Sequence, residues 1–212
     1  GVDLGLWRPA ARTTRDESAA VTRYVFVGRL VDWKAVDLLL FAFARARAHA
    51  PMSLLIIGDG PERRSVEQLA VELGVLTAES DPAAGKVRFC GWLSQADCAQ
   101  TLHRCDALVL PSLMECGGAV VLEAMAMQLP VIATAWGGPA DYVDASCGIL
   151  VEPASQEGFV DDFASALVRL ARCTPDERAA MGKAGRARVV RHFDWDAKLD
   201  RILDIYRDVL TA

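Results

Sequence analysis

The chain has 212 residues, a length typical of one large domain. Hydrophobic residues make up 52% of it and charged residues 24%, which is the composition of a globular protein and excludes a disordered one. The net charge of −5 argues against a partner recognised through a bulk positive field, such as duplex nucleic acid. We therefore expect a single domain over residues 1–212 that binds no nucleic acid.

The cysteines and the apolar stretches place further bounds on the class of protein. Six cysteines stand at irregular intervals without a CxxC pair, and we interpret them as reduced thiols of a cytoplasmic protein. The three histidines are not at ligand spacing, so the sequence predicts no metal site. The longest apolar stretch, 119–136, contains Glu123, Gln128 and Pro130, so we expect no membrane-spanning segment.

Short apolar runs recur along the chain and predict the strands of a parallel sheet that is covered on both faces. The expected strands are 24–27, 54–57, 86–89, 107–110, 131–133 and 149–151. Between them, apolar residues recur at the spacing of a buried helix stripe, as at Val36, Leu39, Leu40 and Phe43. This alternation predicts an α/β fold with a Rossmann-like, doubly wound parallel sheet of about six strands and helices at its C-terminal end.

After residue 151 the chain is predicted to be wholly helical. We expect helices over 158–172, from Thr174 onward with a capping box closed by Glu177, and over 195–210 after a cap at Asp194. The basic run 186–192 is interpreted as the solvated face of a helix, and contact with a membrane surface is the alternative. The segment 78–85 is the loop whose length predicts mobility.

Ligands of an open α/β sheet bind beyond the carboxyl ends of its strands, so the residues after each strand matter most. Arg29 and Lys34 follow the first strand and could converge on an anionic group, whereas the alternative is that both are solvated charges. After the second strand, Gly58 and Gly60 begin a dinucleotide fingerprint, but Arg63 stands at the position of its third glycine. We interpret this segment as a tight turn.

The most informative segment follows the fourth clear strand and contains two glutamates and a glycine pair. Gly117 and Gly118 precede a helix, where free backbone N–H groups favour a phosphate. Glu115 and Glu123 would be roughly 12 Å apart if most of the interval were helical, which exceeds the ~5–9.5 Å of glycosidase carboxylates. This favours a ligand with hydroxyls at both ends of a diphosphate. The alternative is a surface glutamate and a helix-interior one.

A third glycine pair, Gly137 and Gly138, precedes another helix and either admits a ligand to the backbone or forms a plain turn. Trp92 and Trp136 stand at loop edges, and we interpret both as packing residues.

Together these residues resemble the C-terminal, donor-binding half of GT-B-fold retaining glycosyltransferases of family 4, also called glycosyl transferases group 1. The resemblance covers essentially the whole chain. Residues 28–34 resemble the diphosphate-binding GRL…K segment, and 111–126 resemble the PS…E-x7-E-AMA signature, which is the most specific match. Residues 129–138 continue the match, and 192–195 resemble the closing F-S-W segment.

The resemblance implies a nucleotide sugar as substrate, a retaining and metal-independent transfer, and no cofactor. It implies that the diphosphate is held by two cations and by backbone amides of the helix start, namely Arg29, Lys34, Gly117, Gly118 and Ala119. Glu123 would bind the ribose, Leu93 would contact the base, and Glu115 would act as the catalytic residue that orients the donor sugar.

The chain departs from the family at a few positions and covers only part of its fold. Cys116-Gly117 replaces the usual glycine and aromatic residue after Glu115, and Ala35 replaces the glycine after Lys34. The resemblance implies a missing N-terminal half that carries the acceptor site, with 1–20 as linker to it and 195–210 docking on it. The isolated chain is then expected to be inactive.

Two other functions stay open at this point: a nucleotide-sugar epimerase of GT-B fold, and a nucleotide-binding module without turnover. The sequence leaves the base (UDP, GDP or ADP), the sugar, the acceptor and the oligomeric state undetermined.

Overall fold

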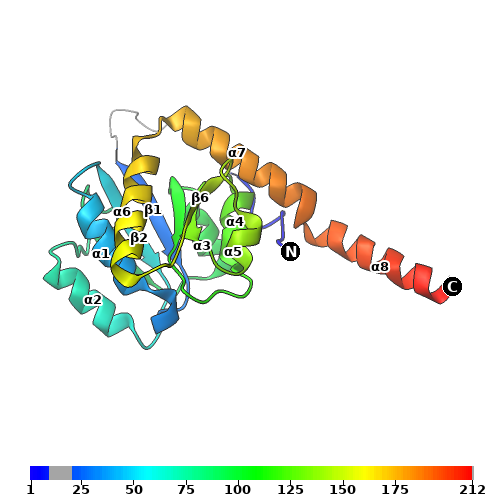
Figure 1. Ribbon diagram of the computed structural model, residues 1–212, viewed down its shortest axis with the longest axis horizontal. Coiled ribbons are helices and arrows are strands. Elements are labelled where there is room, and N and C mark those ends of the chain that lie inside the picture. The colour runs from blue at the N-terminus through cyan, green and yellow to red at the C-terminus, as the bar shows by residue number, and fades with distance from the viewer. Residues whose placement is uncertain (10–20, 212) are drawn as a thin grey trace.

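In the computed structural model, which describes residues 1–9 and 21–211, six parallel strands form one sheet in the order β3-β2-β1-β4-β5-β6. The strands are β1 (Thr22–Val27), β2 (Met52–Ile57), β3 (Val87–Gly91), β4 (Ala107–Leu110), β5 (Val131–Thr134) and β6 (Gly148–Val151). Every predicted strand is present, and helices cover both faces of the sheet (Figure 1). The Rossmann-like doubly wound sheet is therefore confirmed.

The helices of the described residues alternate with the strands as far as β6 and then follow one another. They are α1 (Val36–Ala46), α2 (Arg63–Glu72), α3 (Gln95–Leu102), α4 (Ala119–Ala126), α5 (Gly138–Tyr142), α6 (Gln156–Arg172), α7 (Pro175–His192) and α8 (Trp195–Thr211), with a 3₁₀ turn over Asp32–Lys34. On one side of the sheet α1 packs against α6, and α7 packs along α4.

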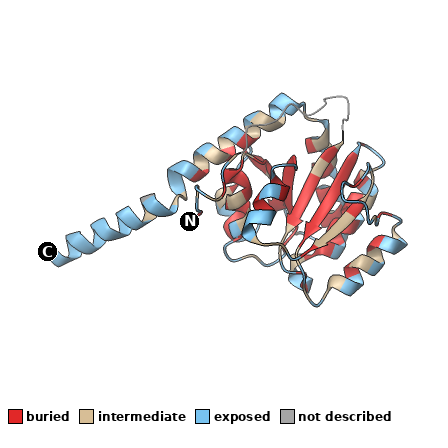
Figure 2. Cartoon of the chain, turned by 180° about the vertical axis from the view of Figure 1, so that it is seen from behind, coloured by how far each residue is buried: buried red, intermediate tan, exposed pale blue. Residues whose placement is uncertain are grey.

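Burial explains why the strands are almost continuously apolar. Every residue of β2, β4 and β5 is buried, because helices cover these inner strands on both faces. The edge strands β3 and β6 keep partly exposed residues. Figure 2 shows this contrast between the buried sheet and the exposed C-terminal helix. The core is one cluster that includes Tyr24, whose hydroxyl donates to the carbonyl of Leu167 at 2.6 Å.

The predicted capping box is confirmed, and one predicted helix start is shifted. Thr174 and Glu177 form the expected reciprocal capping box at the start of α7. Helix α6 begins at Gln156 rather than at residue 158, because the side chain of Ser155 accepts the backbone N–H of Gly158 and caps the earlier turn.

The interpretation of the basic run 186–192 as a solvated helix face is wrong for two of its arginines. Arg186 donates to the carbonyl of Ala126 at the end of α4. Arg188 donates to the carbonyl of Tyr142 at 2.7 Å and pairs with Asp144 at 3.0 Å. Both side chains thus satisfy carbonyl groups left open at helix ends and fasten α7 to the α4 and α5 segments.

Helix α8 projects from the domain, and its residues from 199 to 210 are exposed (Figures 1 and 2). Its apolar side chains face water in this chain, among them Leu199 (50% exposed), Tyr206 (62%) and Leu210 (86%). At the base of α8, Val2 pairs with Asp194, so residues 1–9 lie beside the start of this helix. Residues 10–20 of the predicted linker lie outside the described part of the chain.

No helix of the described residues is both long enough and apolar enough to cross a bilayer. The six cysteines are free thiols, and Cys116 is exposed on the loop before α4.

Candidate functional site

The strand order reverses between β1 and β4, which are neighbours in the middle of the sheet. The loops that leave these two strands therefore lie at the switch point where open α/β sheets bind ligands. They are also joined directly, because the N–H of Leu113 donates to the carbonyl of Trp33 at 2.8 Å. The loop after β5 joins the same group through a bond from the N–H of Gly138 to the carbonyl of Cys116 at 3.1 Å.

At this point the structure brings together two of the predicted site residues, Lys34 and Glu115, which are 81 residues apart in the chain. Their side chains form an ion pair and are only 17% and 12% exposed. The other carboxylate oxygen of Glu115, Oε1, accepts the N–H of Gly118 at 3.0 Å. Glu115 therefore connects the lysine to the start of α4.

The position of Lys34 depends on the turn that follows it. Lys34 ends the 3₁₀ turn, and Ala35 has φ 50° before α1 begins. Glycine adopts this left-handed conformation freely, whereas alanine adopts it at some cost. The N–H of Ala35 donates to the carbonyl of Asp32 at 2.9 Å and closes the turn.

The glycine pair Gly137–Gly138 allows close packing of the backbone against the loop before α4. A Cβ at Gly137 would lie 1.7 Å from the carbonyl oxygen of Glu115, and one at Gly138 would lie 2.5 Å from that of Gly117. Only glycines allow the loop before α4 to lie on this turn. The backbone of Gly137 and Gly138 therefore packs directly against residues 115–118.

The separation of roughly 12 Å between Glu115 and Glu123 was expected on the assumption that most of the interval is helical, and the structure does not meet that assumption. Residues 115–118 are not helical, and α4 begins at Ala119 after Gly118, which has φ 55°. The helix thus spans only the second half of the interval, because the glycines favour a left-handed cap over a continued helix.

Glu123 lies on α4 in the apolar surroundings that its sequence neighbours predict. Burial raises the pKa of its carboxyl group above the usual value. The carboxylate of Glu123 accepts no hydrogen bond from the described residues. Burial of the Cys98 thiol, and to a smaller extent the nearby charge of Glu123, raise the pKa of that thiol to about 12. A partly buried carboxylate without a partner in the protein is costly unless a ligand supplies one.

Arg29 and Leu93 follow β1 and β3 at the same edge of the sheet, and neither forms a hydrogen bond or ion pair with Lys34 or Glu115. Arg29 is exposed just after β1 and pairs with no carboxylate among the described residues. Leu93 is partly buried after β3 and packs against the core. Arg63, to which the sequence analysis gave no role in the site, lies over Gly91 beside this segment, with Nη1 3.3 Å from a Cβ built there. Its pairing with Asp59 at 2.9 Å holds it in place.

The packing interpretation of two tryptophans is wrong. Trp92 is 75% exposed and Trp136 is 52% exposed. They lie just beyond the carboxyl ends of β3 and β5. In the described part of the chain, no group of three or more His, Cys, Asp or Glu side chains could hold a metal ion.

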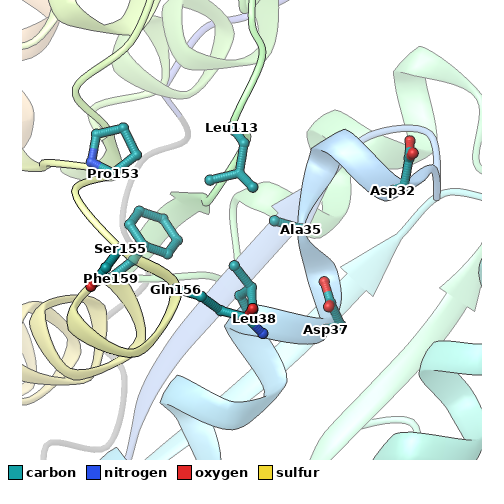
Figure 3. A pocket seen from close by; sticks show the side chains of 9 residues that line it. All are labelled: Asp32, Ala35, Asp37, Leu38, Leu113, Pro153, Ser155, Gln156 and Phe159. Carbon is teal, nitrogen blue, oxygen red and sulfur yellow. The ribbon is translucent and has the colours of Figure 1, made fainter.

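A pocket of about 280 Å³ lies next to this edge, between the start of α1 and the start of α6. Figure 3 shows three segments facing it, which are 32–38, Leu113 and 153–159. Asp32 and Asp37 stand on its α1 side, and no cationic side chain lines it. The two carboxylates oppose an anion, so this pocket does not suit a diphosphate.

Comparison with known proteins shows the family of the chain. The family described as glycosyl transferases group 1 matches residues 22–172. The D-inositol 3-phosphate glycosyltransferase of Segniliparus rotundus is 35% identical over 99% of this chain and 46% of its own length. The chain therefore belongs to the glycosyl transferases group 1 family, and it spans about half the length of this curated relative.

Solved structures show the same fold. Sucrose-phosphate synthase of Thermosynechococcus elongatus matches 100% of this chain and 51% of its own with a TM-score of 0.81 and 28% identity. The C-terminal domain of a glycosyl transferase group 1 protein of Francisella tularensis matches 92% of this chain and 100% of its own (TM-score 0.71, 24% identity). HepE of Anabaena, solved with UDP and glucose, matches 98% of this chain and 55% of its own (TM-score 0.77, 21% identity).

Proposed function

We propose that this chain is the donor-binding domain of a retaining, metal-independent, cytoplasmic glycosyltransferase that uses a nucleoside-diphosphate sugar and no cofactor. The observation that carries the proposal is the Lys34–Glu115 pair at the start of α4. A lysine, a helix N-terminus and a hydroxyl-binding carboxylate are the groups that the junction of a diphosphate and a sugar requires.

Each residue then has one task along the donor. Lys34 and Arg29 neutralise the diphosphate together with the backbone amides of Gly117, Gly118 and Ala119. Glu123 accepts hydrogen bonds from the ribose diol, which would provide the partner that its carboxylate lacks in the protein. Leu93 contacts the base, and Glu115 orients the donor sugar by its hydroxyls.

The contribution of this half to catalysis is electrostatic. Breaking the bond between the sugar and the diphosphate leaves negative charge on the departing phosphate oxygen. The two cations and the helix-end amides are positioned before the reaction to stabilise that charge, which costs no reorganisation when the bond breaks.

The relatives support this proposal. The curated relative named above is a glycosyltransferase of an inositol phosphate, and HepE was solved with a nucleoside diphosphate and a sugar. These names do not favour the epimerase. Since the chain spans about half of its relative, we propose that an N-terminal half supplies the acceptor site, that α8 docks on it, and that residues 1–20 lead to it. The isolated chain should bind donor and transfer nothing.

The test is a titration of the folded chain with UDP, GDP and ADP. Lys34→Ala or Arg29→Ala should weaken binding of the preferred diphosphate about 10- to 100-fold, because a charge-assisted hydrogen bond contributes about 1.5–3 kcal/mol. Lys183→Ala on the exposed face of α7 is the matched control and should change nothing. Equal weakening of the bare nucleoside by Lys34→Ala would contradict the phosphate assignment. Binding without transfer in a chain rejoined to its N-terminal half would instead indicate a non-catalytic module.

A further inference from the structure

Helix α5 lies between two parts of the molecule that the proposed function leaves unconnected. One is the donor loop, residues 115–118, and the other is the α7–α8 junction, residues 193–194. The five residues of α5 form little more than one helical turn, so the helix moves as one piece. A displacement at its first residue is therefore carried to its last residue.

The first turn of α5 packs tightly against the donor loop. A Cβ built at Gly138 would lie 2.5 Å from the carbonyl oxygen of Gly117. A Cβ built at Gly118 would lie 3.2 Å from the side chain of Pro139. The N–H of Gly138 also donates to the carbonyl of Cys116 at 3.1 Å. These surfaces leave no free space between them, so a rearrangement of the donor loop displaces this end of α5.

The other end of α5 is Tyr142, whose half-buried side chain contacts the α7–α8 junction. Its ring meets the ring of Phe193 edge to face, with the two centroids 4.9 Å apart. On its other side, Cε2 of the tyrosine lies 3.0 Å from a Cβ built at Gly138. The backbone carbonyl of Tyr142 accepts Nε of Arg188 at 2.7 Å, which fixes this end of the helix on α7. Tyr142 thus connects the glycine turn to Phe193.

Phe193 lies between α7 and α8, beside the first residues of the described chain. Its carbonyl accepts the N–H of Val2 at 2.9 Å, and the N–H of Trp195 donates to the carbonyl of Val2 at 3.4 Å. The ammonium group of Lys198 on α8 lies 5.4 Å from the centroid of the Phe193 ring. Figure 1 shows the N-terminus beside this junction. The two segments that we propose to lead to the N-terminal half therefore meet at the residue that Tyr142 contacts.

We propose that Tyr142 is a positioning residue that couples the donor loop to the α7–α8 junction. The inference rests on the proposed glycosyltransferase function and adds a residue that touches neither the donor nor the reacting atoms. A diphosphate that takes the N–H of Gly118 from Glu115 rearranges the donor loop, and α5 carries that change through Tyr142 to Phe193. The direction in which α8 leaves this half then depends on donor occupancy. Because coupling between two sites is reciprocal, the orientation of the N-terminal half also changes donor affinity.

Plain packing is the other interpretation of the Tyr142 ring. It predicts that loss of the ring lowers the melting temperature and leaves the response of the junction to nucleotide unchanged. The two interpretations therefore differ in a quantity that stability alone does not report.

The first test is NMR of the Val2 amide in the folded chain, titrated with UDP, GDP and ADP. The diphosphate that binds should shift this amide, because its N–H donates to Phe193. Tyr142→Phe keeps the ring and should keep the shift, whereas Tyr142→Ala should reduce the shift at least threefold. Asp141→Ala, on the exposed side of the same helix, is the matched control and should change nothing.

Two results of this titration would overturn the proposal. One is a Val2 amide that does not respond to a bound nucleotide, and the other is an equal response in Tyr142→Ala at saturation. If none of the three diphosphates binds, the donor site itself is refuted, and this inference falls with it. The two failures are therefore distinguishable.

The second test measures sugar transfer by the chain rejoined to its N-terminal half. Tyr142→Ala and Phe193→Leu should each lower kcat about tenfold, while the isolated variants bind the diphosphate within twofold of the unchanged chain. The double variant should be no slower than either single one, because both remove the same contact. Phe193→Leu keeps an apolar side chain, so it carries both tests if circular dichroism shows that Tyr142→Ala does not fold. An unchanged kcat, or losses that multiply in the double variant, would overturn the proposal.

Discussion

The double contact of Glu115 leads to a prediction with an unexpected sign. Its carboxylate pairs with Lys34 and accepts the N–H of Gly118. These are two of the groups that we assign to the diphosphate. An arriving diphosphate must therefore displace a carboxylate that already occupies its place. Glu115→Gln removes the competing charge and keeps the side-chain shape.

The magnitude follows from the burial of the pair. At 17% and 12% exposure, solvent screens the two side chains much less than it screens a surface pair. A charge-assisted hydrogen bond contributes about 1.5–3 kcal/mol, but glutamine retains a weaker bond to Gly118 and to the lysine. We expect Glu115→Gln to recover about 1 kcal/mol, so that the nucleoside diphosphate binds roughly fivefold more tightly.

Calorimetric titration of the nucleoside diphosphate measures this effect directly. Glu72→Gln on the exposed end of α2 makes the same change in net charge and should leave the affinity unchanged. In the complete enzyme, Glu115→Gln should slow sugar transfer although it tightens nucleotide binding. An unchanged or weaker affinity in a folded Glu115→Gln variant would refute the reasoning, since the carboxylate would then not compete for the phosphate site.

Four further predictions follow from the same structure. Glu123→Gln should penalise ribonucleotides more than 2′,3′-dideoxy analogues. Burial raises the pKa of Glu123, so its ionised form destabilises the folded state at a pH above that pKa. Glu123→Gln should therefore raise the melting temperature at pH 8. The gain should fade as the pH falls toward 4.5, the usual pKa of the group. A gain that is equal at pH 4 and pH 8 would contradict this. EDTA should leave nucleotide affinity unchanged, because Lys34, Arg29 and a helix end neutralise the diphosphate, and a large loss would reveal a metal. Amides of α8 in the monomeric chain should exchange much faster than those of β2 and β4, and equal protection would show that α8 needs no partner.

The sequence by itself determined the sheet and the edge that carries the site. Runs such as 54–57 and 107–110 are apolar at every position, and only strands covered on both faces tolerate that pattern. The capping box at Thr174 also follows from local chemistry, because its partners are three residues apart. The apolar surroundings of Glu123 could be predicted for the same reason, because they come from residues next to it in the sequence.

Only the tertiary structure decided which distant groups meet. The pairing of Lys34 with Glu115 joins residues 81 apart, and Arg63 lies over Gly91 only because β2 and β3 are adjacent. Trp92 and Trp136 are exposed on the loops that follow β3 and β5, although their residue type favours packing. The local sequence pattern predicts the strand or helix to which a residue belongs. Its contacts with distant residues, its exposure and the pockets that it lines depend on how several elements are placed. That placement is set by the packing of the whole core.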